Sequence, residues 1–153
     1  MLRFNSDHKF KIMQIADTQE IPAVSPDTLS LINNALDREK PDLVIFTGDQ
    51  IKGYSKKFKK DPAIIESTID ILVEPIAKRN IPFMVTYGNH DAQCGVDNRG
   101  QYKFYAKYDN FISGDLRNAD DVGTADIQIY SSTEDKPVFE LYIIDSHGKA
   151  KDR

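Results

Sequence analysis

The chain has 153 residues, of which 40% are hydrophobic, 29% are charged and one is a cysteine, Cys94. This length predicts a single domain over residues 1–153 with one core, and the net charge of −4 argues against a basic nucleic-acid-binding surface. A lone cysteine excludes an intramolecular disulfide, and the first residues lack the apolar run of a secretory signal or a membrane anchor, so we expect a cytoplasmic protein without a membrane partner.

The first predicted strand covers Phe10–Ala16, where apolar and polar side chains alternate. It leads directly into Asp17 and Gln19. After a loop that contains two prolines, apolar residues at helical spacing predict a helix over Thr28–Glu39. Pro41 disfavours helical geometry in the residue before it, so this helix should end near that point.

The second predicted strand, Leu43–Thr47, is nearly all apolar, which is typical of a strand buried on both faces. It ends in Gly48-Asp49-Gln50. Five lysines follow within a short segment: Lys52, Lys56, Lys57, Lys59 and Lys60. Two interpretations of this segment stay open, a solvated loop or a basic lip that attracts an anionic substrate.

A second helix is predicted over Ala63–Arg79, with Asp61 as its N-cap and Pro62 in its first turn. The third predicted strand, Pro82–Thr86, follows it. Strands that alternate with helices predict a parallel sheet with right-handed crossovers.

The loop after the third strand reads Tyr87-Gly88-Asn89-His90-Asp91. Gly88 gives the backbone the freedom that a sharp strand-to-loop turn requires. The next three side chains, Asn89, His90 and Asp91, are each able to bind a metal or a phosphate oxygen. In open α/β sheets, ligands collect at the carboxyl ends of the strands, so this loop is a candidate site.

Three further elements are predicted downstream. A short aromatic helix over Tyr102–Phe111 would pack its tyrosines against the sheet or, alternatively, stack them on a base. The segments Ile127–Tyr130 and Val138–Ile144 are separated by a short turn and should pair as an antiparallel hairpin, in a second sheet or at its start.

The three polar loops predict a metal site. Adjacent parallel strands lie about 4.8 Å apart, so Asp17, Asp49 and Asn89 can converge on one crevice. Two metal ions can clamp the attacking and leaving oxygens of a phosphoryl displacement, and they need hard oxygen ligands. We expect Asp49 to bridge the ions, Asp17 to hold one and Asn89 the other, which leaves His90 to contact the substrate.

The three loops resemble the first three motifs of the calcineurin-like metallophosphoesterase superfamily: Asp-x-His, Gly-Asp, and Gly-Asn-His followed by Asp or Glu, each after a strand. The sequence is most similar to the branch with purple-acid-phosphatase-29-like and Dcr2-like phosphatases. Two segments carry that similarity, Phe46-Thr47-Gly48-Asp49 and Leu141-Tyr142-Ile143-Ile144-Asp145-Ser146. The resemblance extends from about Lys9 to Ser146.

The resemblance implies an α/β fold, the αββα sandwich of the superfamily, here truncated to its N-terminal half. It implies hydrolysis of a small phosphorylated substrate by a metal-bound hydroxide. The complete domain would hold two divalent or mixed-valence ions (Mn, Fe or Zn), and this fragment would hold them in part or not at all. The implied metal ligands are Asp17, Gln19, Asp49 and Asn89, and the implied catalytic residues are His90 and Asp91.

Two departures leave an alternative open. Gln19 stands where the family usually has a metal-binding histidine, and an amide oxygen is a weaker ligand. The later lone-His and Gly-His-x-His motifs are absent, because His147 alone follows the third motif and matches neither; we interpret His147 as a solvent histidine. The chain is therefore either a metal-dependent phosphoesterase or a catalytically inactive remnant that binds a phosphorylated ligand or partner.

The last predicted strand also predicts an interface. Val138–Ile144 is apolar on both faces, so it needs cover on each side and neighbours at its edges. If that cover is missing, we expect the chain to form a homodimer through the second sheet, because a two-fold contact covers one patch with its own copy.

Overall fold

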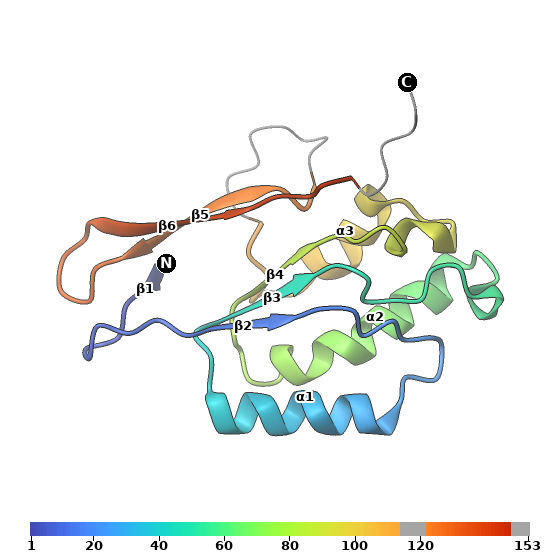
Figure 1. Cartoon of the computed structure of the whole chain (residues 1–153), viewed down its shortest axis with the longest axis horizontal. Coiled ribbons are helices and arrows are strands. Elements are labelled where there is room, and N and C mark those ends of the chain that lie inside the picture. The colour runs from blue at the N-terminus through green and yellow to red at the C-terminus, as the bar shows by residue number, and fades with distance from the viewer. Residues whose placement is uncertain (114–121, 148–153) are drawn as a thin grey trace.

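The computed structural model describes residues 1–113 and 122–147. Figure 1 shows three layers: helices, a first sheet above them and a second sheet on top. The first sheet has the order β2-β3-β4 and the second the order β1-β5-β6. This arrangement confirms the expected α/β fold class with two packed sheets.

The first sheet is parallel, as predicted, and consists of β2 (Ile12–Ile15), β3 (Leu43–Thr47) and β4 (Phe83–Thr86). The first strand is shorter than predicted because its pairing with β3 begins at Ile12, opposite Leu43. Phe10 lies before the strand and packs on Phe4, with 6.0 Å between the ring centroids.

Helices α1 (Pro26–Glu39) and α2 (Pro62–Ala77) lie within two residues of their predicted bounds. Side-chain caps fix both starts: the Ser25 hydroxyl accepts a hydrogen bond in the first turn of α1, and the Asp61 carboxylate accepts one in the first turn of α2.

The third helix was predicted too late in the chain. Helix α3 covers Asn98–Ala106, because the Asp97 carboxylate caps it by accepting the Gly100 N–H at 2.7 Å. Phe111, which the prediction placed in the helix, instead forms a parallel bridge with Phe83 at the edge of β4. Two short 3-10 turns, Lys56–Phe58 and Asp91–Cys94, complete the helical structure of the described residues.

The second sheet contains the predicted antiparallel hairpin of β5 (Ala125–Tyr130) and β6 (Pro137–Ile143). Strand β1 (Leu2–Arg3) pairs in parallel with β5 and was not predicted. Two residues show no periodicity, and their partner lies more than a hundred residues away, so no local pattern indicates this strand.

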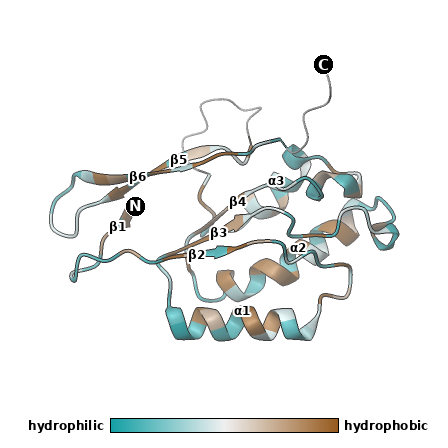
Figure 2. Cartoon of the chain, in the orientation of Figure 1, coloured by the Kyte–Doolittle hydropathy of each residue, from teal (hydrophilic) through white to brown (hydrophobic). Residues whose placement is uncertain are grey.

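Two apolar clusters lie on opposite faces of the first sheet. Val44 and Phe46 face the helices, whereas Leu43 and Ile45 face the second sheet. All four side chains are buried, as expected for a central parallel strand. Apolar residues, brown in Figure 2, follow the strands between the two sheets and the inner faces of the helices.

The second sheet is less well covered. Strand β6 forms its edge, and four large apolar residues there or just beyond are more than half exposed: Val138, Phe139, Tyr142 and Ile144. Within residues 1–113 and 122–147, no helix packs on the outer face of this sheet, and none is long and apolar enough to cross a membrane.

Candidate functional site

The loops after β2 and β3 are joined by their backbones. The Asp17 N–H donates to the Gly48 carbonyl at 3.0 Å, and the Gln19 N–H donates to the Asp49 carbonyl at 2.9 Å. This backbone pairing between the two loops continues beyond these residues, where Glu20 forms a parallel bridge with Ile51. The two predicted carboxylates, Asp17 and Asp49, therefore emerge at the same edge of the sheet.

The loop after β4 is tied to the same point. The His90 N–H donates to Asp49 Oδ1 at 2.8 Å. In return, Asp91 Oδ2 accepts the N–H groups of Asp49 and Gly88, each at 2.7 Å. All three loops that carry predicted site residues thus meet at Asp49.

Asp91 is more deeply buried than its predicted catalytic role requires. Its relative exposure is 0%, and its carboxylate accepts three backbone N–H groups, from Asp49, Gly88 and Ile51. A side chain without exposed atoms cannot touch a substrate. These contacts fit a positioning role for Asp91 in place of the predicted catalytic one.

The loops approach each other so closely that positions 48 and 88 have room only for glycine. A Cβ atom at Gly48, whose φ is +106°, would lie 2.5 Å from the Gly88 nitrogen, and one at Gly88 would lie 2.1 Å from Asp49 Oδ1. Asp17 and Asp49 themselves have φ values of 52° and 53°, in the left-handed region that non-glycine residues rarely adopt. Strained backbone of this kind collects at functional sites.

Burial also sets the electrostatics of the loop. It raises the pKa of Asp91 to about 6, because the loss of solvation outweighs the lowering by the three N–H donors. Burial raises the pKa of Tyr87 as well, and the nearby charge of Asp91 acts in the same direction.

His90 is held by two neighbours. Its ring makes an edge contact with Tyr54, with 4.8 Å between centroids, and its Nδ1 lies 3.1 Å from Gln93 Oε1. The Tyr54 hydroxyl donates to Gln19 Oε1 at 3.4 Å, so it joins the first and third motifs. Sequence reasoning missed Tyr54, because nothing in the lysine-rich segment distinguishes it.

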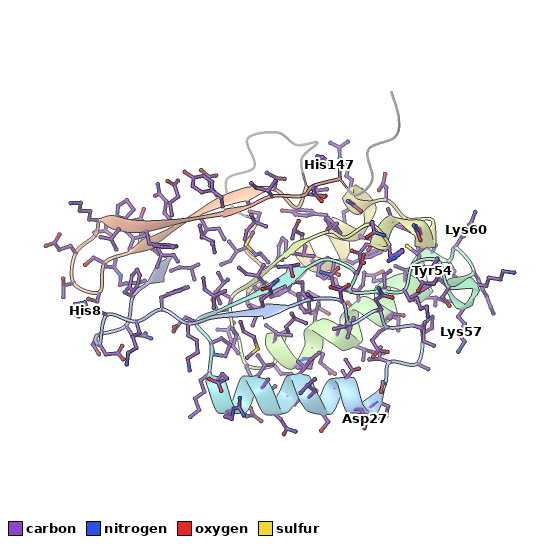
Figure 3. The ribbon with its side chains drawn as sticks, in the orientation of Figure 1. His8, Asp27, Tyr54, Lys57, Lys60 and His147 are labelled. Carbon is purple, nitrogen blue, oxygen red and sulfur yellow. The ribbon has the colours of Figure 1, made fainter. Side chains whose placement is uncertain are left out.

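The lysine-rich segment lies at the same end of the molecule. Figure 3 shows Tyr54, Lys57 and Lys60 there, with Lys57 and Lys60 extending outward and His8 at the opposite end. Lys52 lies over the Tyr54 ring, with Nζ 5.2 Å from its centroid. The four other lysines are exposed, while buried Phe58 anchors the turn that carries them.

A cleft of about 340 Å³ opens beside His90. The third motif forms one side of it. Sequence reasoning missed most of the other residues, because they come from a later turn, from α3 and from the end of the second sheet. The lining consists of Gly88, Asn89, His90, Ala92, Gln93, Asn98 and His147.

The predicted metal ligands supply two carboxylates and two carboxamides. Asp17 and Asn89 are exposed, Gln19 is half-buried and Asp49 is buried. Hard oxygen donors of this kind suit divalent cations such as Mg²⁺ and Mn²⁺. Among residues 1–113 and 122–147, no group of three or more His, Cys, Asp or Glu side chains has metal-binding geometry. The donor set therefore fits a cation by its chemistry, but a two-ion site would need further ligands.

Comparison with protein families agrees with this geometry. The family model for calcineurin-like phosphoesterases matches residues 10–151, which include all three loops, the first sheet and the β5–β6 hairpin of the second.

Curated relatives include a yeast protein and two plant proteins. The chain is 34% identical over 170 residues to phosphatase DCR2 of Saccharomyces cerevisiae, and the match covers 95% of this chain and 28% of that protein. It is 27% identical to the probable inactive purple acid phosphatase 14 of Arabidopsis thaliana, over 98% of this chain and 43% of that protein. It is also 27% identical to the probable inactive purple acid phosphatase 29 of the same plant, over 95% of this chain and 42% of that protein. The chain spans less than half the length of each relative.

Proposed function

We propose that this chain, which belongs to the calcineurin-like phosphoesterase family, hydrolyses a phosphate ester with the help of divalent cations at the edge where the loops after β2, β3 and β4 meet. The observation that carries the proposal is the hydrogen bond from the His90 N–H to Asp49 Oδ1. It places the predicted bridging carboxylate beside the residue expected to contact the substrate.

Asp17, Asp49 and Asn89 would hold the cation, with Gln19 as a weaker ligand. When bound, such a cation lowers the pKa of water and neutralises charge on the phosphoryl oxygens. The oxygen-rich donor set favours manganese among the three candidates Mn, Fe and Zn.

His90 acts on the leaving group. His90 Nδ1 lies 3.1 Å from Gln93 Oε1, which can only accept hydrogen bonds, so we assign the proton of the neutral ring to Nδ1. In the imidazolium form, Nε2 carries the second proton and can pass it to the leaving oxygen. The edge contact with Tyr54 fixes the ring for this step.

A small phosphorylated molecule is the proposed substrate. Lys52 and the exposed lysines beyond it lie at the same end of the molecule as the site. Their charge would attract an anion during encounter, in line with the basic-lip interpretation. Neither nucleic acid nor a membrane is part of the proposal, and lone Cys94, which is buried, fits a reducing compartment such as the cytoplasm.

A second candidate is a remnant that binds phosphorylated ligands without turnover. Two observations favour it: Gln19 replaces the usual histidine, and no cluster of three His, Cys, Asp or Glu side chains lies within the described residues. Two of the relatives also carry the word inactive in their names.

Hydrolysis of an aryl phosphate separates the two candidates. The protein should be purified from its full reading frame and assayed with added Mn²⁺, beside Asp49→Asn and the control Glu134→Gln, which changes an exposed carboxylate in the β5–β6 turn. Turnover that Asp49→Asn reduces at least a hundredfold and Glu134→Gln preserves supports the phosphoesterase. Phosphate binding without turnover supports the remnant.

A further inference from the structure

The cleft beside His90 has an unusual chemistry for a site near carboxylates. Its polar side chains are two imidazoles and three carboxamides, from His90, His147, Asn89, Gln93 and Asn98. No carboxylate is among the described lining residues. All five side chains can donate hydrogen bonds, so the cleft suits an anionic, oxygen-rich ligand.

We propose that His147 is a substrate-binding residue of this cleft and contacts the phosphoryl group together with His90. The inference rests on the proposed function, because it assigns a residue to the same site. His147 is contributed by the segment after β6, so the second sheet would take part in binding as well as in folding.

Asp145 holds the turn that carries His147. Its exposure is 4%, and its carboxylate accepts the His147 N–H on Oδ1 at 2.7 Å and the Asn98 amide on Oδ2 at 3.1 Å. The Asp145 N–H donates to the Thr124 hydroxyl at 3.0 Å. Asp145 thereby joins three segments: its own turn, helix α3 through Asn98, and the start of β5 through Thr124. The phosphatase-like Asp145-Ser146 pair acquires a physical role through Asp145.

The His147 backbone is held in an uncommon conformation, with φ at 58°. A non-glycine residue adopts this left-handed region mainly where its surroundings impose it. Here the bond to Asp145 Oδ1 imposes it and leaves the imidazole at the cleft, with its side chain 66% exposed. Nδ1 lies 3.9 Å from Asp145 Oδ2, which is too long for a hydrogen bond. The ring can therefore still turn its N–H toward a ligand.

The chain has three histidines, His8, His90 and His147, so their imidazole signals can be assigned by substitution and followed by NMR. The probe is inorganic phosphate, titrated into the protein at constant Mg²⁺. We expect the His90 and His147 signals to shift together with one apparent dissociation constant. His8 lies at the opposite end of the molecule and should not move (Figure 3).

The outcomes separate the two proposals. If His90 shifts and His147 does not, the inference is wrong while the proposed function survives. If neither shifts at saturating phosphate, both fail. If all three shift equally, binding is nonspecific and the inference is again wrong.

Substitutions give a second readout by calorimetry with phosphate. His147→Ala should weaken phosphate binding about tenfold, because a hydrogen bond to a charged group contributes on that order. His147→Gln keeps a donor and should recover most of the loss, whereas the control His8→Ala should bind like the wild type. Equal affinity of His147→Ala and wild type would overturn the inference. The NMR titration of the wild-type protein stands even if a variant fails to fold.

Discussion

Asp91 accepts a hydrogen bond from the backbone N–H of Asp49, with 2.7 Å between the nitrogen and Oδ2. The same oxygen accepts the Gly88 N–H, so one buried carboxylate locks the loop after β3 to the loop after β4. The order of the site therefore depends on a residue that no substrate can reach.

The first prediction concerns the stability that Asp91 provides. Asp91→Ala leaves two buried N–H groups and one partly buried N–H group without an acceptor, at about 1 kcal/mol each, so we expect a loss of about 3 kcal/mol in the free energy of unfolding. Asp91→Asn keeps one acceptor oxygen and should lose less. Urea denaturation measures both, with Glu134→Gln as the control. A loss below about 0.5 kcal/mol in Asp91→Ala would show that the three bonds do not hold the loops.

A second prediction concerns pH. The pKa of Asp91 is about 6 in the folded protein, above the ordinary value of 3.8, so the folded state binds this proton more tightly than the unfolded state. The corresponding stability is fully present below about pH 3.8 and is lost as the pH rises through about 6. A shift of this size corresponds to about 3 kcal/mol.

Unfolding free energies of wild type and Asp91→Asn, measured from pH 4 to 7 with EDTA present, test this sign. The difference in unfolding free energy between wild type and Asp91→Asn should narrow as the pH rises, because only the wild type has the group that titrates and loses stability. A difference that stays constant would mean that the pKa of Asp91 is not raised.

A third prediction uses the departure at Gln19. Its side chain is half-buried beside Tyr54, with its Oε1 accepting the tyrosine hydroxyl at 3.4 Å. Imidazole is a stronger ligand for Zn²⁺ than a carboxamide. Gln19→His should therefore tighten Zn²⁺ binding by about tenfold, measured by calorimetry, and Gln14→His on β2 serves as the control. Equal tightening in both variants would indicate a nonspecific histidine effect.

A fourth prediction concerns the edge strand. Val138 is 55% exposed on β6, and Ile144, just beyond the strand, is 73% exposed. An uncovered apolar edge favours pairing with a second copy, so we propose that the 153-residue chain self-associates through this strand. Light scattering should show a dimer or a larger species that the double substitution Val138→Lys and Ile144→Lys converts to monomer.

The matched control is Leu31→Lys on α1. Leu31 is 70% exposed, but it lies on the helical layer away from the second sheet. The Leu31→Lys substitution should leave the self-association of the chain unchanged. A wild-type chain that stays monomeric at high concentration would show that the exposed strand needs no partner.

Local patterns predicted most of the fold. The nearly all-apolar Leu43–Thr47 was placed without error, because a short apolar run of this kind is typical of a strand buried on both faces. The third helix was misplaced, because its start is set by the cap at Asp97 while its aromatic residues continue past its end. Strand β1 was not predicted, because it pairs only with β5, which is far away in the sequence.

The site could be predicted in part. The meeting of the three loops that carry Asp17, Asp49 and Asn89 follows from strand order, which the alternation of strands and helices indicates. The burial of Asp91 and the place of His147 depend on contacts between loops far apart in sequence. No spacing rule reports such contacts, so these two assignments required the structure.

Manganese binding tests the central claim most directly. Calorimetry should show weak Mn²⁺ binding to the wild-type chain. We predict that Asp49→Asn, which keeps an oxygen to accept the His90 N–H but removes the charge, weakens this binding by at least about tenfold, and that Glu134→Gln does not. Unchanged binding in a folded Asp49→Asn protein would contradict the account, because the carboxylate at which the three loops meet would then hold no metal.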